Sequence, residues 1–420
     1  MGRRADPSTQ EEMVNRFQEK RRHLLAESDR YHAPGLPLKF LRQQAHFTTP
    51  ASNYDMALKA VEKGSSAASR ILEKFHISLA ELSDTLEVPV SALESELAAE
   101  PQSPMVMVDS EDAQALREDV ILRGRQNAIK IFREGNWGST LRFYRPSGLR
   151  LDFCLDDLVT VLSEAGKGLP ADRYPVDGIV WPKAEQPEEI AFVCEVLAGI
   201  EESLGLEKNR IKLEFLVESG WAVAQLPLLV KAALPRLAGI IFGIADYSAD
   251  IGLPTIHNNH PVCDWARAAI VNIAGTVGVP AIDNMTVDYP VADSRLSDGE
   301  NHLFIKRRIK HVFDDARHGE QLGMDGKWVG HPLQLFAVRL AYRLALPEEE
   351  IRTETEKILS YAQAVADEQG ATIIEGVMSD RATDRHARNK LRKALALGLL
   401  EARKGVELGL ITEGELKELG

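Results

Sequence analysis

Short apolar segments alternate with longer amphipathic segments over most of the chain, beginning near residue 43. Eight of them have the length and composition of buried strands: Ala45–Pro50, Met105–Asp109, Ser139–Arg145, Gly178–Lys183, Ile211–Gly220, Leu237–Tyr247, Val279–Asp283 and Lys327–Pro332. Strands that alternate with helical segments predict parallel βαβ units, and eight such units predict an α/β fold, the (β/α)8 TIM barrel. An open doubly wound sheet is the alternative, but no Gly-x-Gly-x-x-Gly motif follows any of these segments.

This alternation divides the 420 residues into a barrel and its additions. Residues 1–42 are expected to form an N-terminal helical extension, because a charged helical stretch is followed there by Pro34 and Pro37, which break it. Residues 43–345 are expected to form the barrel, with the charged stretch 66–101 as a helical insertion. Residues 346–420 have an almost wholly helical pattern and are expected to act as a C-terminal lid or oligomerisation region.

The charge and cysteine content limit the partners and the compartment. The net charge of −13 argues against nucleic-acid and anionic-membrane binding. The N-terminus lacks a signal-type apolar core, and no apolar run approaches the roughly 20 residues of a membrane span. The three cysteines are widely spaced and odd in number, which favours a reducing compartment. We therefore expect a cytoplasmic protein.

Two carboxylates follow consecutive apolar segments in the middle of the chain. Glu218 ends the fifth segment and Asp246 lies near the end of the sixth. In a parallel barrel the carboxyl ends of the strands share one rim, where catalytic groups sit. Two acids on one rim repel each other unless a cation binds between them, and Mg²⁺ favours oxygen ligands of this kind. The sequence therefore predicts a Mg²⁺ site held by Glu218 and Asp246.

Further charged residues end the neighbouring segments. Asp109, Glu111 and Asp112 follow the second segment, where they could hold metal-bound waters or could cap the next helix. Arg145 ends the third segment, where its guanidinium suits a carboxylate substrate or a surface ion pair. Lys183 ends the fourth segment and could form a Schiff base, although the acid pair favours metal chemistry.

Six stretches in the same order resemble the citrate lyase beta-subunit and malyl-CoA lyase family. The family's D-L-E-D, R-V-N-G-L and P-K resemble Asp109-Ser110-Glu111-Asp112, Arg145-Pro146-Ser147-Gly148-Leu149 and Pro182-Lys183. Its I-E-T and F-G-x-x-D resemble Val217-Glu218-Ser219 and Phe242-Gly243-Ile244-Ala245-Asp246. Its late G-x-D-G-K-x-x-x-H-P-x-Q is matched between Gly323 and Gln334. The resemblance covers about residues 45–340.

The resemblance implies a Mg²⁺-dependent carbon–carbon lyase that cleaves or forms a malyl-, citramalyl- or citryl-CoA type 3-hydroxyacyl-CoA. It implies Glu218 and Asp246 as the metal ligands, with metal-bound waters held by Asp109, Glu111 and Asp112. Its substrate contacts would be Arg145, Gly243, Ala245 and Asp246. The family usually begins its first strand with R-S, whereas this chain has Ala45-His46. Two alternatives therefore stay open, a class II 2-oxo-acid aldolase without CoA and a non-catalytic acyl-CoA-binding homologue.

The C-terminal region carries one more resemblance. Gly376-Val377-Met378-Ser379-Asp380 is similar to the family's G-x-M-x-D, whose aspartate reaches into a neighbouring subunit's site. The resemblance thus implies that Arg145 and Asp380 are catalytic, and that the protein is a homotrimer or homohexamer. The expected partner is a small molecule, an acyl-CoA or a 2-oxo acid.

Overall fold

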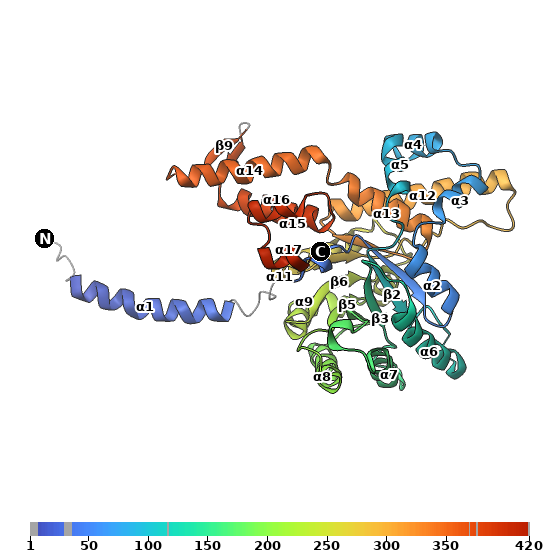
Figure 1. Cartoon of the computed structure of the whole chain (residues 1–420), viewed down its shortest axis with the longest axis horizontal. Helices are drawn as coiled ribbons and strands as arrows, with labels where there is room; N and C mark the ends of the chain where they lie inside the picture. Colours follow the sequence, from blue (N-terminus) through green and yellow to red (C-terminus); the bar gives the residue numbers. More distant parts are fainter. Residues whose placement is uncertain (1–6, 29–35, 116, 369, 375–376, 419–420) are drawn as a thin grey trace.

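Eight parallel strands close into a barrel in chain order, because β1 pairs with both β2 and β8 (Figure 1). The computed structural model describes residues 7–28, 36–115, 117–368, 370–374 and 377–418. The barrel strands are β1 (Ala45–Pro50), β2 (Met105–Asp109), β3 (Leu141–Arg145), β4 (Gly178–Trp181), β5 (Lys212–Val217), β6 (Leu237–Phe242), β7 (Ala281–Asp283) and β8 (Gly326–Val329). The predicted TIM barrel is confirmed, and the open sheet is excluded.

One strand ends earlier than predicted, at the position that carries the second acid. The apolar pattern predicted a strand through Tyr247, but β6 ends at Phe242. The chain turns at Gly243 and begins the short helix α10 (Ile244–Asp250). Asp246 therefore lies in the first turn of a helix, still at the carboxyl-terminal rim of the barrel.

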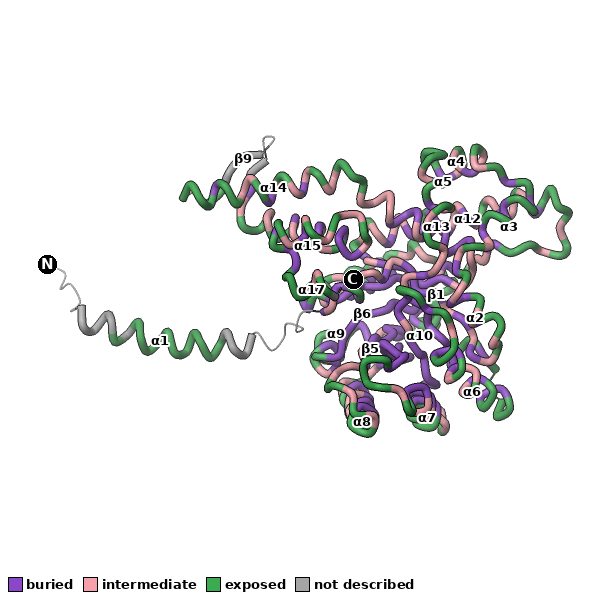
Figure 2. The backbone as a smooth tube through the Cα atoms, viewed as in Figure 1, coloured by how far each residue is buried: buried purple, intermediate pink, exposed green. Residues whose placement is uncertain are grey.

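Helices cover the outside of the barrel. They are α2 (Tyr54–Lys63), α6 (Glu118–Glu134), α7 (Cys154–Gly166), α8 (Pro187–Leu204), α9 (Gly220–Ala233), α11 (Pro261–Val277), α12 (Asp298–Gln321) and α13 (Pro332–Leu344), with a short 3-10 helix η3 (Ala171–Arg173). Figure 2 shows the strands buried and the helices turning exposed faces outward. In the part of the chain that the structure describes, no helix is both long enough and apolar enough to span a membrane.

The stretch predicted as a helical insertion contains three helices, α3 (Ala68–Lys74), α4 (Leu79–Leu86) and α5 (Val90–Ala98). Helix α5 packs on α13, and α4 packs on α12 (Figure 1). Glu96 of α5 is buried and pairs with Arg339 and Arg343 of α13, at 2.9 and 3.4 Å. An ion-pair network therefore joins this segment to the barrel.

The C-terminal extension comprises α14 (Glu348–Ala366), the hairpin strands β9 (Thr372–Ile374) and β10 (Val377–Ser379), α15 (Arg381–Ala396), α16 (Ala402–Glu407) and α17 (Glu413–Glu418). Helix α15 packs against the 3-10 helix η2 (Leu38–Leu41), where Leu38 contacts Leu395 and Ala396. Lys393 pairs with Asp325, the residue that precedes β8. The extension thus lies at the amino-terminal end of its own barrel, opposite the rim that carries the acids.

The N-terminal helix α1 (Pro7–Ser28) stands apart from the barrel in Figure 1. Residues 1–6 and 29–35 of the predicted N-terminal extension lie outside the described residues.

Two titratable side chains face each other inside the barrel. His46 of β1 and Glu214 of β5 come from strands that are not neighbours, so their contact of 3.8 Å crosses the interior. Their side-chain nitrogen and oxygen atoms have no hydrogen-bond partner among the described residues. Burial lowers the pKa of His46 to about 3 and raises the pKa of Glu214 to about 8, so both side chains are neutral near pH 7.

Candidate active site

Three carboxylates meet at the carboxyl-terminal rim. Glu218 follows β5 directly, Asp246 lies in the first turn of α10, and Asp112 lies in the loop after β2. One oxygen of each carboxylate lies within 4.8 Å of the others. Oxygen donors at this spacing suit a hard divalent cation, which fits the predicted metal site and adds Asp112 to its candidate ligands.

Glu218 is the buried member of this cluster, with 5% of its surface exposed. Its Oε2 accepts a hydrogen bond from the backbone N–H of Lys183 at 2.9 Å. Burial raises the pKa of Glu218 to about 7, Asp246 adds to the rise, and Arg145 opposes it. A buried carboxylate that resists ionisation is stabilised when a cation binds beside it.

Gly243 permits the close approach of β6 to Glu218. A Cβ atom at Gly243 would lie 2.8 Å from Glu218 Oε1, closer than non-bonded atoms allow. The glycine predicted as a substrate contact therefore shapes the position of the carboxylate. Ala245, the other predicted contact, is exposed beside Asp246 on α10.

Arg145 lies at the end of β3 and is almost fully buried. Its guanidinium binds both oxygens of Asp109, at 2.6 and 2.7 Å, and stacks over the Trp328 ring at 5.1 Å. Burial disfavours the charge of Arg145, but the Asp109 and Glu111 carboxylates outweigh burial and raise its pKa. The Nη1 atom has no hydrogen-bond partner among the described residues, but it forms longer ion pairs with Glu111 and Asp112, at 3.5 and 3.9 Å. It can donate a hydrogen bond to an anionic substrate in competition with these two acids.

The acids after β2 have three different environments. Asp109 binds Arg145 and accepts hydrogen bonds from the backbone of Glu111 and Ala113, at 2.9 and 3.1 Å. Asp112 belongs to the carboxylate cluster with Glu218 and Asp246, whereas Glu111 pairs with Lys183. They do not cap a helix, because α6 begins only at Glu118. The predicted role of holding metal-bound waters stays a prediction, and in this arrangement Asp109 is occupied by Arg145.

Lys183 is a site residue that sequence reasoning underrated. Its Nζ lies 2.5 Å from Glu111 and 3.1 Å from Asp112. Burial alone would lower the pKa of Lys183, but these carboxylates raise it above its usual value. A protonated amine is not a nucleophile, so a Schiff base is disfavoured. The residue also adopts the left-handed backbone, with φ of 51°, which is strained for a lysine and typical of functional sites.

Two cavities adjoin the cluster. One, of about 300 Å³, is lined by Glu218, Asp246 and Lys183. The other, of about 1070 Å³, shares Lys183 and has Leu149, Leu151 and Phe192 in its lining. The rim thus offers a charged recess beside a larger, mostly apolar one.

Asp380 is not brought to this cluster within one chain. It caps the amino terminus of α15, where its Oδ1 accepts hydrogen bonds from the backbone of Ala382 and Thr383 at 2.9 and 3.1 Å. These bonds, Thr383 first, lower the pKa of Asp380. The other end of α15 packs at the opposite face of the barrel. Gly376 of the matched stretch lies outside the described residues.

Comparisons with known proteins agree on one family. The domain of unknown function DUF6986 matches residues 143–419. An L-malyl-CoA/beta-methylmalyl-CoA lyase of Cereibacter sphaeroides is 30% identical over 307 residues, covering 69% of this chain and 87% of the relative. The enzyme of the same name from Rhodobacter capsulatus is 29% identical over 317 residues, covering 71% of this chain and 90% of the relative.

Solved structures share the fold. A citrate lyase from Burkholderia xenovorans has a TM-score of 0.57 at 20% identity, covering 89% of this chain and 96% of its own. Protein CitE from Mycobacterium tuberculosis, in complex with magnesium, acetoacetate and coenzyme A, has a TM-score of 0.51 at 18% identity. It covers 84% of this chain and 98% of its own. The chain therefore belongs to the DUF6986 family and, with its relatives at 30% identity, to the family of the L-malyl-CoA/beta-methylmalyl-CoA lyases.

Proposed function

We propose that this protein is a Mg²⁺-dependent carbon–carbon lyase that cleaves or forms a 3-hydroxyacyl-CoA of the malyl-CoA type. The observation that carries the proposal is the meeting of Asp112, Glu218 and Asp246 at the carboxyl-terminal rim, with Arg145 beside them. Relatives that share most of the chain are named malyl-CoA lyases, and no observation favours an aldolase without CoA or a non-catalytic binder.

The chain's own residues have separate tasks at this rim. Asp112, Glu218 and Asp246 would hold the metal, which when bound supplies a Lewis acid to the substrate's carboxylate and carbonyl oxygens. Arg145, fixed by Asp109, presents to the anionic end of the substrate its Nη1, which makes no hydrogen bond among the described residues. Lys183 neutralises Glu111 and orients Asp112 from the other side.

Cleavage begins at the substrate's hydroxyl group. A base removes its proton, the adjacent carbon–carbon bond breaks, and the hydroxyl carbon becomes the carbonyl of a 2-oxo acid. The electron pair of the broken bond passes to the acyl-CoA fragment as an enolate, which an acid then protonates at carbon. Condensation is the reverse sequence.

We further propose Asp380 of another subunit as the group that exchanges the proton at this carbon. The support is its position on an extension that lies away from its own rim, together with the resemblance of residues 376–380 to the family stretch. The assembly would be a homotrimer or homohexamer with closed symmetry. The free cysteines Cys154, Cys194 and Cys263 suit the cytoplasmic location that the sequence predicts.

Subunit mixing tests this arrangement. An inactive Asp380→Asn chain mixed with an inactive Glu218→Gln chain should regain part of the activity, because some sites then draw both intact residues from different subunits. Absence of recovery after verified subunit exchange would contradict a role for Asp380 across subunits.

A substrate screen tests the function itself. Malyl-, citramalyl- and citryl-CoA should be assayed for cleavage with Mg²⁺, and acetyl-CoA with glyoxylate or pyruvate for condensation. We expect turnover of at least one CoA thioester, abolished by EDTA and by Glu218→Gln. Turnover of a free 2-oxo-acid aldol adduct with none of any thioester would overturn the CoA assignment.

A further inference from the structure

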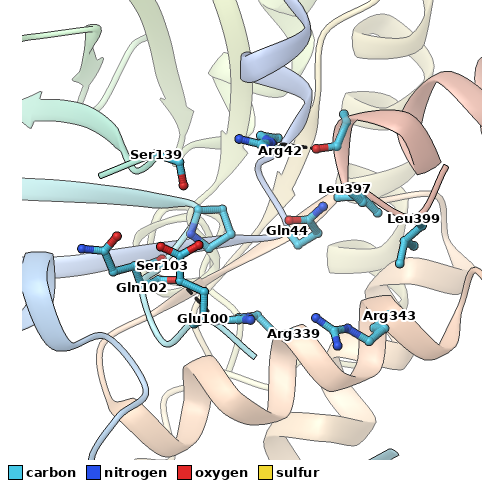
Figure 3. A pocket seen from close by; sticks show the side chains of 12 residues that line it. Arg42, Gln44, Glu100, Gln102, Ser103, Ser139, Arg339, Arg343, Leu397 and Leu399 are labelled. Atoms are coloured by element: carbon cyan, nitrogen blue, oxygen red, sulfur yellow. Dashed lines mark hydrogen bonds between the residues drawn. The ribbon is translucent and has the colours of Figure 1, made fainter. Parts of the chain in front are cut away.

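A second polar cavity lies at the opposite end of the barrel from the acid cluster. It has a volume of about 180 Å³ and is walled by the residues that precede β1, β2 and β3, among them Gln44, Ser103 and Ser139 (Figure 3). Helix α13 forms a second wall, and Leu397 and Leu399 of the C-terminal extension form a third. The cavity shares no lining residue with the cavities at the rim.

Three guanidinium groups line this cavity. Arg339 and Arg343 lie one turn apart on α13, and Arg42 lies across from them (Figure 3). Arg42 Nε donates to the carbonyl oxygen of Ala396 at 2.8 Å, while its two terminal nitrogens have no hydrogen-bond partner among the described residues. Arginine side chains gathered in this way repel one another unless an anion lies among them.

The carboxylates around the cavity do not balance these charges. Glu96 is shared by Arg339 and Arg343, and the other nearby acid is Glu100, whose backbone carbonyl oxygen accepts a hydrogen bond from Arg339 at 2.6 Å. Two acids therefore oppose three guanidinium groups. Burial raises the pKa of Glu96, which weakens its hold on a negative charge. Burial lowers the pKa of Arg339, and the neighbouring Arg343 lowers it further.

Neutral hydrogen-bonding groups complete the lining. The side chains of Gln44 and Ser139 make no hydrogen bond to any described residue, and both border the cavity. Amide and hydroxyl donors combined with guanidinium groups are the usual recognition set for carboxylates and phosphates.

We propose that this cavity binds a small oxyanion carrying two negative charges, either phosphate or a short dicarboxylate. Such an anion would contact Arg42 beside η2, Arg343 on α13 and the neutral donors at the strand starts. Because Arg42 donates a hydrogen bond to Ala396, the bound anion would also stabilise the contact between the C-terminal extension and the barrel. The site would thus stabilise the placement of α15 without taking part in the chemistry at the rim.

The test is a calorimetric titration of the full-length protein with inorganic phosphate and, separately, with succinate. EDTA is present throughout, so that anion binding through a metal at the rim is excluded, and chloride keeps the ionic strength constant. We expect saturable binding by at least one anion, and the tighter of the two identifies the chemical class. Amide hydrogen exchange of residues 394–400 should slow when that anion is bound.

The proposal predicts opposite changes in anion affinity for variants that remove a positive charge and for a variant that removes a negative charge. Arg42→Gln and Arg343→Gln should each weaken binding by about tenfold or more, because a charged hydrogen bond is lost. Glu96→Gln should strengthen it, because a competing carboxylate is removed. Arg307→Gln, at an exposed position of α12, is the matched control and should leave affinity unchanged.

Two results would overturn the proposal. One is no saturable binding of either anion up to about 10 mM. The other is binding that persists unchanged in both Arg42→Gln and Arg343→Gln, with these variants folded by circular dichroism.

Discussion

The two ends of the barrel carry charge clusters of opposite sign. At the carboxyl-terminal rim Asp112, Glu218 and Asp246 converge, which leaves room for a cation. At the amino-terminal end Arg42, Arg339 and Arg343 converge around a small cavity. The net charge of −13 does not predict the local charge at either end, because nearby side chains determine the charge of each cluster.

The clusters also differ in how they are built. Each acid at the rim is held by a segment that follows a strand, so the barrel alone positions it. The amino-terminal cluster needs the insertion for Glu96, helix α13 for two arginines and the extension for its third wall. We infer that the rim depends on the barrel itself, whereas the opposite end depends on the segments added to it.

The largest expected effect is a loss of turnover, caused by a substitution at the carboxyl-terminal rim. Asp246→Asn removes one charge from the proposed metal site and should lower turnover about a thousandfold, equivalent to about 4 kcal/mol. Mg²⁺ affinity, measured by calorimetry, should fall in parallel while the fold is retained. Asp172→Asn is the matched control, because Asp172 is exposed in η3 and lines neither cavity at the rim. Equal activity in both variants would remove Asp246 from the site.

Arg145→Lys should have the next largest effect. Lysine keeps the charge but cannot bind both oxygens of Asp109, so turnover should fall about a hundredfold, or about 3 kcal/mol. Because the pair is buried, the melting temperature should also fall, which calorimetry would record. An unchanged rate constant with a lowered melting temperature would make Arg145 purely structural.

Glu96→Gln, at the amino-terminal end of the barrel, should lower stability and leave turnover nearly unchanged. Loss of its charge leaves Arg339 and Arg343 without their shared partner, so unfolding free energy should fall by about 2 kcal/mol. Turnover at saturating substrate should stay within about twofold, since no residue of the rim is touched. A large loss of activity in the folded variant would show that the two ends are coupled.

The smallest expected effect concerns the interior between the two ends. The folded pKa of Glu214, about 8, exceeds that of an ordinary glutamate, so its stabilising contribution is complete below pH about 4.5 and is lost as pH rises through 8. The opposite holds for His46, whose contribution is lost as pH falls from about 6.5 through 3. Glu214→Gln should therefore recover about 2–3 °C of melting temperature at pH 9 relative to pH 6. The exposed Glu195→Gln should show the same pH profile as the wild type, and a matching profile for Glu214→Gln would refute the assignment.

The barrel could be predicted from the sequence because its signals are local. Segments such as Met105–Asp109 are apolar up to their final acid, and helix α2 begins after Asn53, whose side chain caps it. The helix between the fifth and sixth strands, α9 (Gly220–Ala233), has a weaker local signal. That helix contains Pro227 and few polar residues, so its sequence lacks the periodicity of an amphipathic helix.

The site could be predicted only in part, for a geometric reason. Strand ends fix where Glu218 and Arg145 emerge, so the rim follows once the barrel is recognised. The position of Asp112 beside Glu218 and Asp246 and the pairing of Lys183 depend on loop paths that no periodicity describes. The amino-terminal cluster brings residues about 300 positions apart, such as Arg42 and Arg339, to one cavity, and no sequence pattern records this placement.

Gly243 has a consequence for how this chain can change over evolutionary time. The Glu218 side chain fills the space that a side chain at position 243 would need, so the two positions are not independent. Replacing the glycine, even by alanine, would push the glutamate aside before any new interaction could compensate. A shorter acid at 218 would open room for a side chain at 243 but would draw the carboxylate back from its neighbours. Substitutions here are therefore expected to be accepted only in pairs, which makes Gly243 a marker of an intact rim although it carries no reactive group.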